Sequence, residues 1–412
     1  MKSILTFLAC VFLAAGCGDD SGQTAMQPTP SDLSEALRRR RTDQQVVVDG
    51  NTAFALDLYG KLRQRPGNVV VSPSSVSLAL GMTYAGARGE TERQLASVLH
   101  FELSQERLHP AMAALAQALK SVGPAEPQLA IANRLWAREG FPLREAFLTV
   151  TRDHYGAALG RADFPEPGRT EINAWTADQT ANKIQQLIKE GVLDQQTVLV
   201  LVSAIYFKGQ WVDQFSEANT KPADFYVTPK EVVQVPMMHT TNAFFSYGED
   251  EEVEILELPY RAGGAGGKCS MVILLPKEKD GLAKLEASLT PVKLRHLLNR
   301  PDPKGKFPVH LPKFTFSSEY SLLLTLREMG LTNLHDFRGM SDGGSVFLSA
   351  VEHAGFISVD EKGTEAAAAT AGMFPVSGPS PWPVFRADHP FLFAIRHNAT
   401  GSLLFLGRLV RP

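Results

Sequence analysis

Cysteine is scarce in this chain of 412 residues, which contains only three. Cys10 and Cys17 lie in the first 17 residues, so Cys269 is the one thiol in the body of the chain, where it has no second cysteine for an internal disulfide. Cys269 stands in the apolar run KCSMVILLP, which predicts a buried structural cysteine rather than a reactive thiol. The fold must therefore be stabilised by its core.

A strong charge of either sign is also lacking. Charged residues make up 21% of the chain, hydrophobic residues make up 44%, and the formal net charge is −3. This is the composition of a soluble globular protein that buries a large core. Because nothing in the charge balance favours binding to a polyanion, we expect no nucleic-acid partner.

The usual sequence motifs of enzymes are missing. The chain contains no H-E-x-x-H, G-x-S-x-G, S-x-x-K, C-x-x-C or G-x-G-x-x-G pattern. The glycine-rich tract 263–267 does not complete a phosphate-binding loop, because Ala262 and Cys269 stand where glycine and Ser or Thr are needed. We therefore expect no enzyme, no cofactor and no metal. Isolated polar residues that resemble catalytic groups are expected to be structural: His353, His389 and Ser345.

The first hydrophobic run is too short to span a membrane. It extends from Ile4 to Ala15 after Lys2 and indicates an export signal. It ends in LAAGC, residues 13–17, which resembles the bacterial lipobox, where the cysteine becomes the first mature residue and carries lipid. We expect a lipoprotein signal peptide at residues 1–17, lipid attachment at Cys17 and a membrane as partner. A plain cleaved signal, with Cys17 incidental, is the alternative.

A polar segment follows this signal. Residues 18–45 are rich in Gly, Ser, Pro, Gln and Asp, which predicts a flexible tether. Its Arg38–Arg41 run is expected to be solvated rather than bound to an anionic surface. The protein is then exported, as a cell-envelope lipoprotein of the outer membrane or cell surface, or as a secreted protein. Residues 46–412 are expected to form a single domain.

Hydrophobic spacing in this domain predicts helices early and strands late. The long run 197–211 is rich in Val, Leu and Ile and predicts a central strand buried on both faces. Further strands are expected at residues 69–71, 129–137, 232–248, 253–260, 269–276 and 307–318, with a final strand pair in 389–410. Helices are expected at residues 51–65, 73–87, 89–101, 170–188 and 322–331. Without βα alternation, this order predicts an α+β fold with mostly antiparallel sheets.

One late segment has an unusual composition. Residues 361–381 have the sequence EKGTEAAAATAGMFPVSGPSP. Its alanines favour a helix, but Gly363, Gly372 and three prolines indicate a loop.

Nine segments, in order from about Asn51 to Pro412, resemble the serpin family of serine protease inhibitors. They are NVVVSPSSVS, ALGMTYAGARGETERQLASVLHF, INAWTADQTANKIQQLI, TVLVLVSAIYFKGQW, VPMMH, ELPY, LPKF, HAGFISVDEKGTEAAAAT and FRADHPFLFAI. The resemblance implies the serpin fold, in which helices pack on mostly antiparallel sheets and a reactive loop, here about residues 361–385, is exposed.

The resemblance also implies a mechanism. In serpins a target serine protease cleaves the loop and forms an acyl-enzyme, and the N-terminal part of the loop then inserts into the central sheet and distorts the protease. We accordingly expect a monomer that inhibits irreversibly and binds its target protease covalently. Because side chains alternate along a strand, the small residues at 364, 366, 368 and 370 would face the interior. The implied hinge residues are Glu361, Gly363, Thr364, Glu365, Ala366, Ala368 and Thr370.

The cleaved bond is less well defined by the pattern. Family spacing from the hinge puts the specificity residue at Ser377, whereas one residue fewer gives cleavage between Val376 and Ser377. We prefer Val376, because a small aliphatic side chain suits the shallow apolar pocket of an elastase-like protease. Phe374 would suit a chymotrypsin-like pocket, but it precedes Pro375. Residues 363–385 contain no Arg or Lys, which argues against trypsin-like targets.

Four polar residues match the cluster that serpins keep where the sheet opens. Ser72, Ser75 and His353 match the family pattern, while Ser203 stands where the family usually has asparagine. Because Ser makes fewer hydrogen bonds than Asn, the resemblance predicts a weaker cluster. The alternative is that these are ordinary satisfied core polar groups. A second departure is two apparently extra residues between the cleavage region and FRADHPFLFAI.

Two alternatives to an inhibitor stay open at this point. One is a non-inhibitory protein of the same fold that binds or carries a ligand, although Gly363–Ala371 carries no bulky or charged residue at the inward positions. The other is an enzyme on another fold, because catalytic triads are defined by geometry rather than by spacing.

Overall fold

The computed structural model describes residues 41–120, 128–156, 159–241, 243–261, 268–342, 346–364 and 384–412. Thr42–Pro412 forms one compact unit. Its first helix, α2, begins at Asp43, three residues before the predicted domain start, because the Thr42 hydroxyl accepts a hydrogen bond from the Gln45 amide and caps the helix. None of the helices in the described ranges is both long and apolar enough to cross a membrane.

A six-stranded sheet forms the centre of the unit and has the order β12-β13-β14-β4-β2-β3. Its central strands β4 and β13 pair in parallel, as do β2 and β3 at one edge, whereas β12 and β14 lie antiparallel to their neighbours and β2 lies antiparallel to β4. Val, Leu and Ile residues on β4 are buried on both faces, as the long apolar run predicted. The strands are β12 (Phe314–Ser321), β13 (Leu348–Val359), β14 (Gly363–Thr364), β4 (Leu199–Gln210), β2 (Gln128–Arg138) and β3 (Gly160–Ala162).

Two further sheets complete the described strands. One has the order β1-β17-β16-β9-β8-β7-β10 and the other the order β15-β11-β6-β5. The first contains β1 (Val69–Val71), β17 (Ser402–Leu409), β16 (Phe391–His397), β9 (Cys269–Pro276), β8 (Val253–Pro259), β7 (Phe244–Glu249) and β10 (Asp302–Lys306). The second contains β15 (Phe385–Arg386), β11 (Val309–Pro312), β6 (Glu231–Thr240) and β5 (Lys221–Thr228). Most pairings are antiparallel, which confirms the predicted α+β class.

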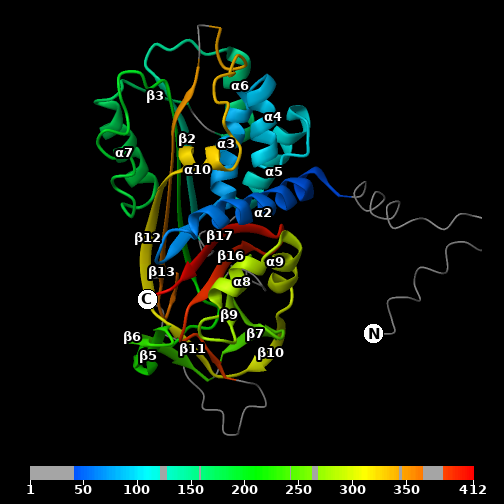
Figure 1. Cartoon of the computed structure of the whole chain (residues 1–412), viewed down its shortest axis with the longest axis vertical. Helices are drawn as coiled ribbons and strands as arrows, with labels where there is room; N and C mark the ends of the chain where they lie inside the picture. Colours follow the sequence, from blue (N-terminus) through cyan, green and yellow to red (C-terminus); the bar gives the residue numbers. More distant parts are fainter. Residues whose placement is uncertain are drawn as a thin grey trace, which may run out of the picture. The chain divides into compact units, whose positions relative to one another are not determined.

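Helices cover both faces of the six-stranded sheet (Figure 1). α7 lies on one face, and α3, with α4, α5 and α6 behind it, lies on the other. Every residue of α3 is buried, because its small and apolar side chains fit between the sheet and the other helices. The helices are α2 (Asp43–Leu62), α3 (Pro73–Gly86), α4 (Gly89–Val98), α5 (Gln105–Lys120), α6 (Glu145–Tyr155), α7 (Gly168–Gln179), η1 (Glu217–Asn219), α8 (Leu282–Ser288), α9 (Pro291–Leu298) and α10 (Leu322–Glu328).

The predicted helix at 170–188 is wrong in its second half. α7 ends at Gln179, because Ala181 and Asn182, which follow Thr180 at its C-terminus, adopt left-handed backbone angles. Residues 180–197 instead run without regular structure to β4, and we call them the covering segment. Their apolar side chains pack on the sheet, and the Asn173 side chain holds the backbone of Ile188 through two hydrogen bonds. The apolar spacing that predicted a helix at residues 180–188 therefore belongs to an irregular segment whose apolar side chains pack on the sheet.

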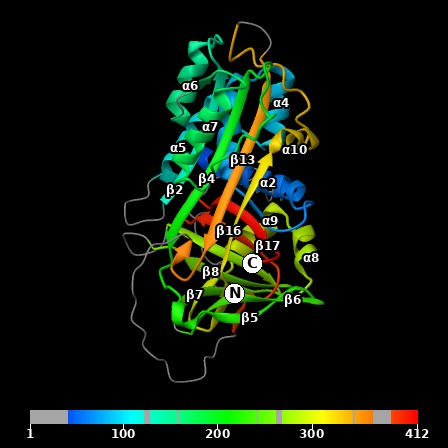
Figure 2. The ribbon, with the colours of Figure 1, turned by 90° about the vertical axis from the view of Figure 1, so that its left-hand side faces the viewer.

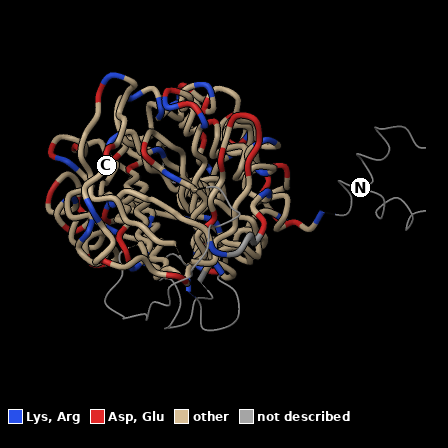
Figure 3. The backbone as a smooth tube through the Cα atoms, turned by 90° about the horizontal axis from the view of Figure 1, so that it is seen from below, with Lys and Arg blue, Asp and Glu red and all other residues tan. Residues whose placement is uncertain are grey.

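Two predicted strands are each divided in the structure. Residues 232–248 form β6 and β7, and residues 307–318 form β11 and most of β12. β11 and β12 belong to different sheets, so the chain changes sheet at Lys313. Cys269 lies on β9 and is buried, as expected for a structural cysteine. Acidic and basic residues are interspersed around the described chain, as Figure 3 shows.

Candidate functional site

A two-residue strand marks the beginning of the candidate site. β14 lies between β13 and β4 at one end of the six-stranded sheet (Figure 2). Thr364 pairs with Val359 of β13 and with Gly209 of β4. Further along, β13 and β4 pair directly, with His353 opposite Ser203. The two central strands are thus separated at one end and joined in the middle.

Thr364 is buried between these two strands. It is 1% exposed, and its hydroxyl lies 2.7 Å from the Tyr260 hydroxyl. Gly363 beside it has no room for a side chain, since a Cβ atom would overlap the carbonyl oxygen of Gly209. A small hydroxyl residue and a glycine are therefore what this position between two strands accepts.

The carboxylate of Glu361 anchors the chain before β14. Its Oε2 lies 2.8 Å from Lys313 Nζ, and its Oε1 accepts a 2.6 Å hydrogen bond from the Thr220 hydroxyl. Burial alone would raise the pKa of Glu361, but these hydrogen bonds outweigh it and lower the pKa. The backbone is held as well, because the amides of Phe215 and Trp211 donate to the carbonyls of residues 361 and 362.

The four predicted cluster residues lie together beneath the sheet. Ser72 directly follows β1 and caps α3 through a hydrogen bond from the Ser75 amide to its hydroxyl. The Ser72 amide donates to His353 Nε2 at 3.1 Å, and Ser75 Oγ lies 3.0 Å from Ser203 Oγ. His353 Nδ1 lies 2.8 Å from the carbonyl oxygen of Ser203 and 3.1 Å from its hydroxyl. The cluster thus joins β13, β4 and the start of α3.

His353 is neutral in this arrangement. Nε2 accepts a hydrogen bond from a backbone amide, so the proton lies on Nδ1, which donates to the Ser203 carbonyl. Burial lowers the pKa of His353 to about 4, although the hydrogen bond to Ser203 acts in the opposite direction. The imidazole therefore links the two strands as a neutral group at physiological pH.

Asn133 completes the cluster and was missed by the sequence reasoning. It lies on β2, directly opposite Ser203. Its Oδ1 accepts a 2.8 Å hydrogen bond from the Ser75 hydroxyl, and its Nδ2 donates to the Ser75 carbonyl at 2.8 Å. The predicted weakness at Ser203 is therefore offset by an amide from the neighbouring strand. The clue was a lone Asn in the apolar run LAIANRLWA, but only the register of β2 on β4 shows which residue it faces.

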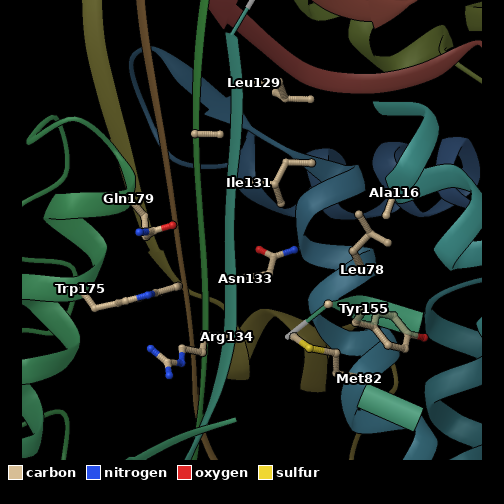
Figure 4. A pocket seen from close by; sticks show the side chains of 12 residues that line it. Leu78, Met82, Ala116, Leu129, Ile131, Asn133, Arg134, Tyr155, Trp175 and Gln179 are labelled. Atoms are coloured by element: carbon tan, nitrogen blue, oxygen red, sulfur yellow. The ribbon is translucent and has the colours of Figure 1, made fainter. Parts of the chain in front are cut away.

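A cavity of about 470 Å³ lies beside this residue. Figure 4 shows Leu129, Ile131 and Asn133 on the side of β2 that faces Leu78, and Arg134, Trp175 and Gln179 on the other side. The cavity follows the part of β2 beyond its pairing with β3, which involves only Trp136–Arg138. Asn133 thus hydrogen-bonds to the polar cluster and also lines this cavity at the edge of the sheet.

Several predicted residues lie outside the described ranges, and His389 has a structural role. His389 Nε2 lies 2.7 Å from the Pro276 carbonyl oxygen and Nδ1 lies 2.8 Å from Asp388 Oδ1. The ring therefore links the loop before β16 to the end of β9. The remaining candidates stay predictions: Cys17, Ser345, Glu365, Ala366, Ala368, Thr370, Val376 and Ser377.

Comparisons with known proteins agree with this geometry. The family model described as serpin (serine protease inhibitor) matches residues 49–412. Leukocyte elastase inhibitor A of Rattus norvegicus is 40% identical over 382 residues, which covers 89% of this chain and 99% of the relative.

Solved structures of similar proteins align over almost the whole chain. The structure of Serpin48 from the insect Tenebrio molitor aligns with a TM-score of 0.78 at 31% identity and covers 89% of this chain and 98% of that chain. Human thyroxine-binding globulin, in complex with thyroxine, aligns with a TM-score of 0.80 at 28% identity and covers 90% and 100% of the two chains. Together with the position of β14 and the polar cluster, these matches show that the chain is not an enzyme but belongs to the serpin family of serine protease inhibitors.

Proposed function

We propose that this protein inhibits an elastase-like serine protease irreversibly, by inserting its cleaved reactive loop between β13 and β4. The observation that carries the proposal is β14, where Thr364 already lies buried between these two strands. Its position supports a sheet that accepts a strand from this end. No large or charged side chain needs to be desolvated at the point of entry.

The register of β14 supports a specific path for the inserted strand. Thr364 opposes Val359 and Gly209, and the strand runs antiparallel to both neighbours. Continued one residue at a time, this register would bring Thr370 between His353 and Ser203. Insertion would then break the hydrogen bond between the two strands and offer His353 the Thr370 hydroxyl in its place. A hydroxyl at this inward position keeps the buried imidazole satisfied.

The length of the sheet supports cleavage after Val376. β4 and β13 are each 12 residues long, which corresponds to about 40 Å of extended chain. In the same register, Phe374 would reach Leu199 at the far end of β4. A cut after Val376 would therefore free enough chain to fill the whole gap, and it would carry an attached protease the length of the sheet.

The relatives support the choice of an elastase-like target. Leukocyte elastase inhibitors are 40–41% identical to this chain over almost their whole length, and Val376 suits a shallow apolar specificity pocket. The target is therefore a serine protease that prefers small aliphatic residues, and it becomes a covalent partner of the monomeric inhibitor.

The alternative of a ligand carrier rests on the cavity beside Asn133 and on the fold shared with a thyroxine-binding protein. Fold similarity alone does not separate the two functions. The hinge favours the inhibitor, because Gly363 and Thr364 fit the gap between the strands and the inward positions that follow are all small.

A panel of elastase-, chymotrypsin- and trypsin-like proteases tests the proposal. We expect a complex that survives SDS with the elastase-like enzyme, and a new chain end after Val376 by mass spectrometry. Cleavage of the loop by every protease without a stable complex would contradict inhibition by insertion. A stable complex with a cut elsewhere would change only the cleaved bond.

We also propose that residues 1–17 are a lipoprotein signal and that lipid on Cys17 holds the exported protein at the cell envelope. The observation behind this is the LAAGC sequence followed by a polar segment. Cys17→Ser should release the protein in soluble form or block its processing. Unchanged membrane fractionation of this variant would rule out the lipid anchor, and a cleaved, unlipidated protein would identify a plain export signal.

A further inference from the structure

Glu352 is a carboxylate inside the central sheet, next to His353 but on the opposite face. It is 5% exposed, and its Oε1 atom has no hydrogen-bond partner among the described residues. Its neighbours two positions away on β13, Ala350 and Ala354, pack with Ile184 and Leu187 of the covering segment. Alternation along β13 therefore places the carboxylate beneath that segment.

The groups around this carboxylate satisfy it only in part. On β12 the hydroxyl of Ser321 hydrogen-bonds to it, and on β4 the directly opposite residue is the apolar Val202. From the covering segment, Lys189 attracts it, but the ammonium group of Lys189 is paired with Glu319 at 3.0 Å. The second lysine there, Lys183, lies over the ring of Phe356.

Burial is the main cause of the shifted pKa of Glu352. It raises the pKa of Glu352 to about 7, while the Ser321 hydrogen bond and Lys189 act in the opposite direction. The protonated carboxyl therefore gives the closed fold its full stability below the unfolded pKa near 4.5. That stability is lost as the pH rises towards 7, and the loss is constant above it.

Loop insertion would change these surroundings directly. The covering segment packs on both central strands, since Ile184, Leu187 and Ile188 share one cluster with Val200 and Val202 of β4 and with the two alanines of β13. A new strand between β13 and β4 moves them apart by one strand spacing, roughly 5 Å. The covering segment must then lose part of its packing on the two separating strands, and water can reach the carboxylate of Glu352.

We propose that Glu352 makes the rate of strand insertion depend on pH, because its ionised carboxylate favours opening of the sheet beneath the covering segment. The proposal rests on the proposed function, since it concerns the same insertion step. It predicts faster insertion above neutral pH than at pH 5.5, and a contribution of Glu352 to the stability of the intact protein that falls as the pH rises. Protonation would keep the sheet closed.

A synthetic peptide with the sequence of residues 363–376 tests this without a protease. The peptide is mixed with the intact full-length protein, and the rate of insertion is followed by the rise in melting temperature. We expect the wild-type insertion rate to be about tenfold higher at pH 8.5 than at pH 5.5. A factor of ten corresponds to a fall of one unit in the pKa of Glu352 when the sheet opens. Glu352→Gln should remove this dependence, and Glu352→Asp should restore it.

Glu319→Gln is the matched control, because it removes a carboxylate that contacts the same lysine but is 38% exposed. Its pH profile should follow that of the wild type. Equal pH profiles for wild type and Glu352→Gln, with insertion in both, would overturn the role of Glu352 and leave the proposed function intact. Failure of the peptide to insert in any variant at any pH would overturn both.

The melting temperature of the intact proteins gives a second measurement that does not need insertion. Glu352→Gln should melt at a higher temperature than the wild type at pH 8.5, and the difference should be clearly smaller at pH 5.5. A constant difference at both pH values would show a purely structural effect of the substitution and would contradict the proposal.

Discussion

The two ends of the path proposed for the inserting strand are held in different ways. At the hinge, β13 and β4 are already separated by Gly363 and Thr364, and the contacts anchor the entering chain. At the polar cluster, His353 and Ser203 join the same two strands directly. The hinge therefore prepares the sheet for a new strand, whereas the cluster keeps the sheet closed.

This difference separates two kinds of substitution. Changes at the hinge should decide whether the loop can enter at all. Changes in the cluster should alter how easily the sheet opens, while a strand can still enter. Hinge substitutions should therefore change the formation of the inserted state. Cluster substitutions should change mainly the stability of the intact state.

The largest effect is expected for Thr364→Arg. Thr364 is buried between two strands, and an arginine cannot enter there without severe desolvation. The loop would still be cut, but the yield of SDS-stable complex should fall at least about a hundredfold, since a buried unpaired charge costs several kcal/mol. Glu365→Arg, at the next residue, which would face outward on the inserted strand, is the control and should still form complex. Normal inhibition by Thr364→Arg would contradict insertion between β13 and β4.

Lys313→Met should have the next largest effect. It removes the ion pair of the buried Glu361 carboxylate and leaves it with hydrogen bonds to the Thr220 hydroxyl and to a backbone amide. Lys313 is 36% exposed, so we expect a loss of about 2 kcal/mol of unfolding free energy rather than the full value for a buried pair. Lys61→Met is the matched control, because Lys61 is equally exposed and pairs with the exposed Glu328 at 3.9 Å. Equal losses in the two variants would argue against an anchoring role of Glu361.

Asn133→Ala should have a smaller effect and a different signature. It removes two hydrogen bonds to Ser75, so we expect a loss of about 1–2 kcal/mol in the intact protein. The closed sheet should open more readily, and insertion of the 363–376 peptide should become faster. Asn299→Ala, which removes one exposed hydrogen bond to Arg396, should change neither quantity. Slower insertion in Asn133→Ala would show that the cluster does not hold the sheet closed.

The smallest effect is expected from the pH dependence of His353. Burial lowers its pKa to about 4, so its contribution is complete above the unfolded pKa near 6.5 and is lost as the pH falls towards 4. Between pH 7.5 and 5.5 this amounts to about 1 kcal/mol. Chemical denaturation of His353→Gln should show a correspondingly flatter slope of the unfolding free energy against pH over this range. An unchanged slope would mean that the imidazole is not the group that titrates.

The sequence predicted the parts of the fold that depend on local patterns. The apolar run of β4, the strand-to-helix transition at Ser72 and the inward position of Thr364 follow from periodicity and from the family resemblance. Prediction failed where contacts between distant segments decide the structure. Asn133 joins the cluster only because of its register with Ser203, and Ile184–Ile188 leaves the helix because Asn173 and the sheet hold it.

Glu352 was missed for a related reason. In sequence it is one charged residue beside a histidine, in a run that alternates only weakly between apolar and polar residues. Its burial depends on the covering segment, whose first half, residues 180–188, the sequence assigned to a helix. A buried carboxylate in a central strand could therefore be found only after the structure showed what lies above it.

The most direct test of the account compares the melting curve of the intact protein with that of the protein cut by an elastase-like protease. Cleavage at an exposed loop normally lowers stability, because it adds chain freedom. Here the freed residues 363–376 would form a new ladder of hydrogen bonds between β13 and β4. We predict that the cleaved protein melts at least about 10 °C higher than the intact one. A cleaved form that melts at the same or a lower temperature would contradict insertion of the loop into the sheet.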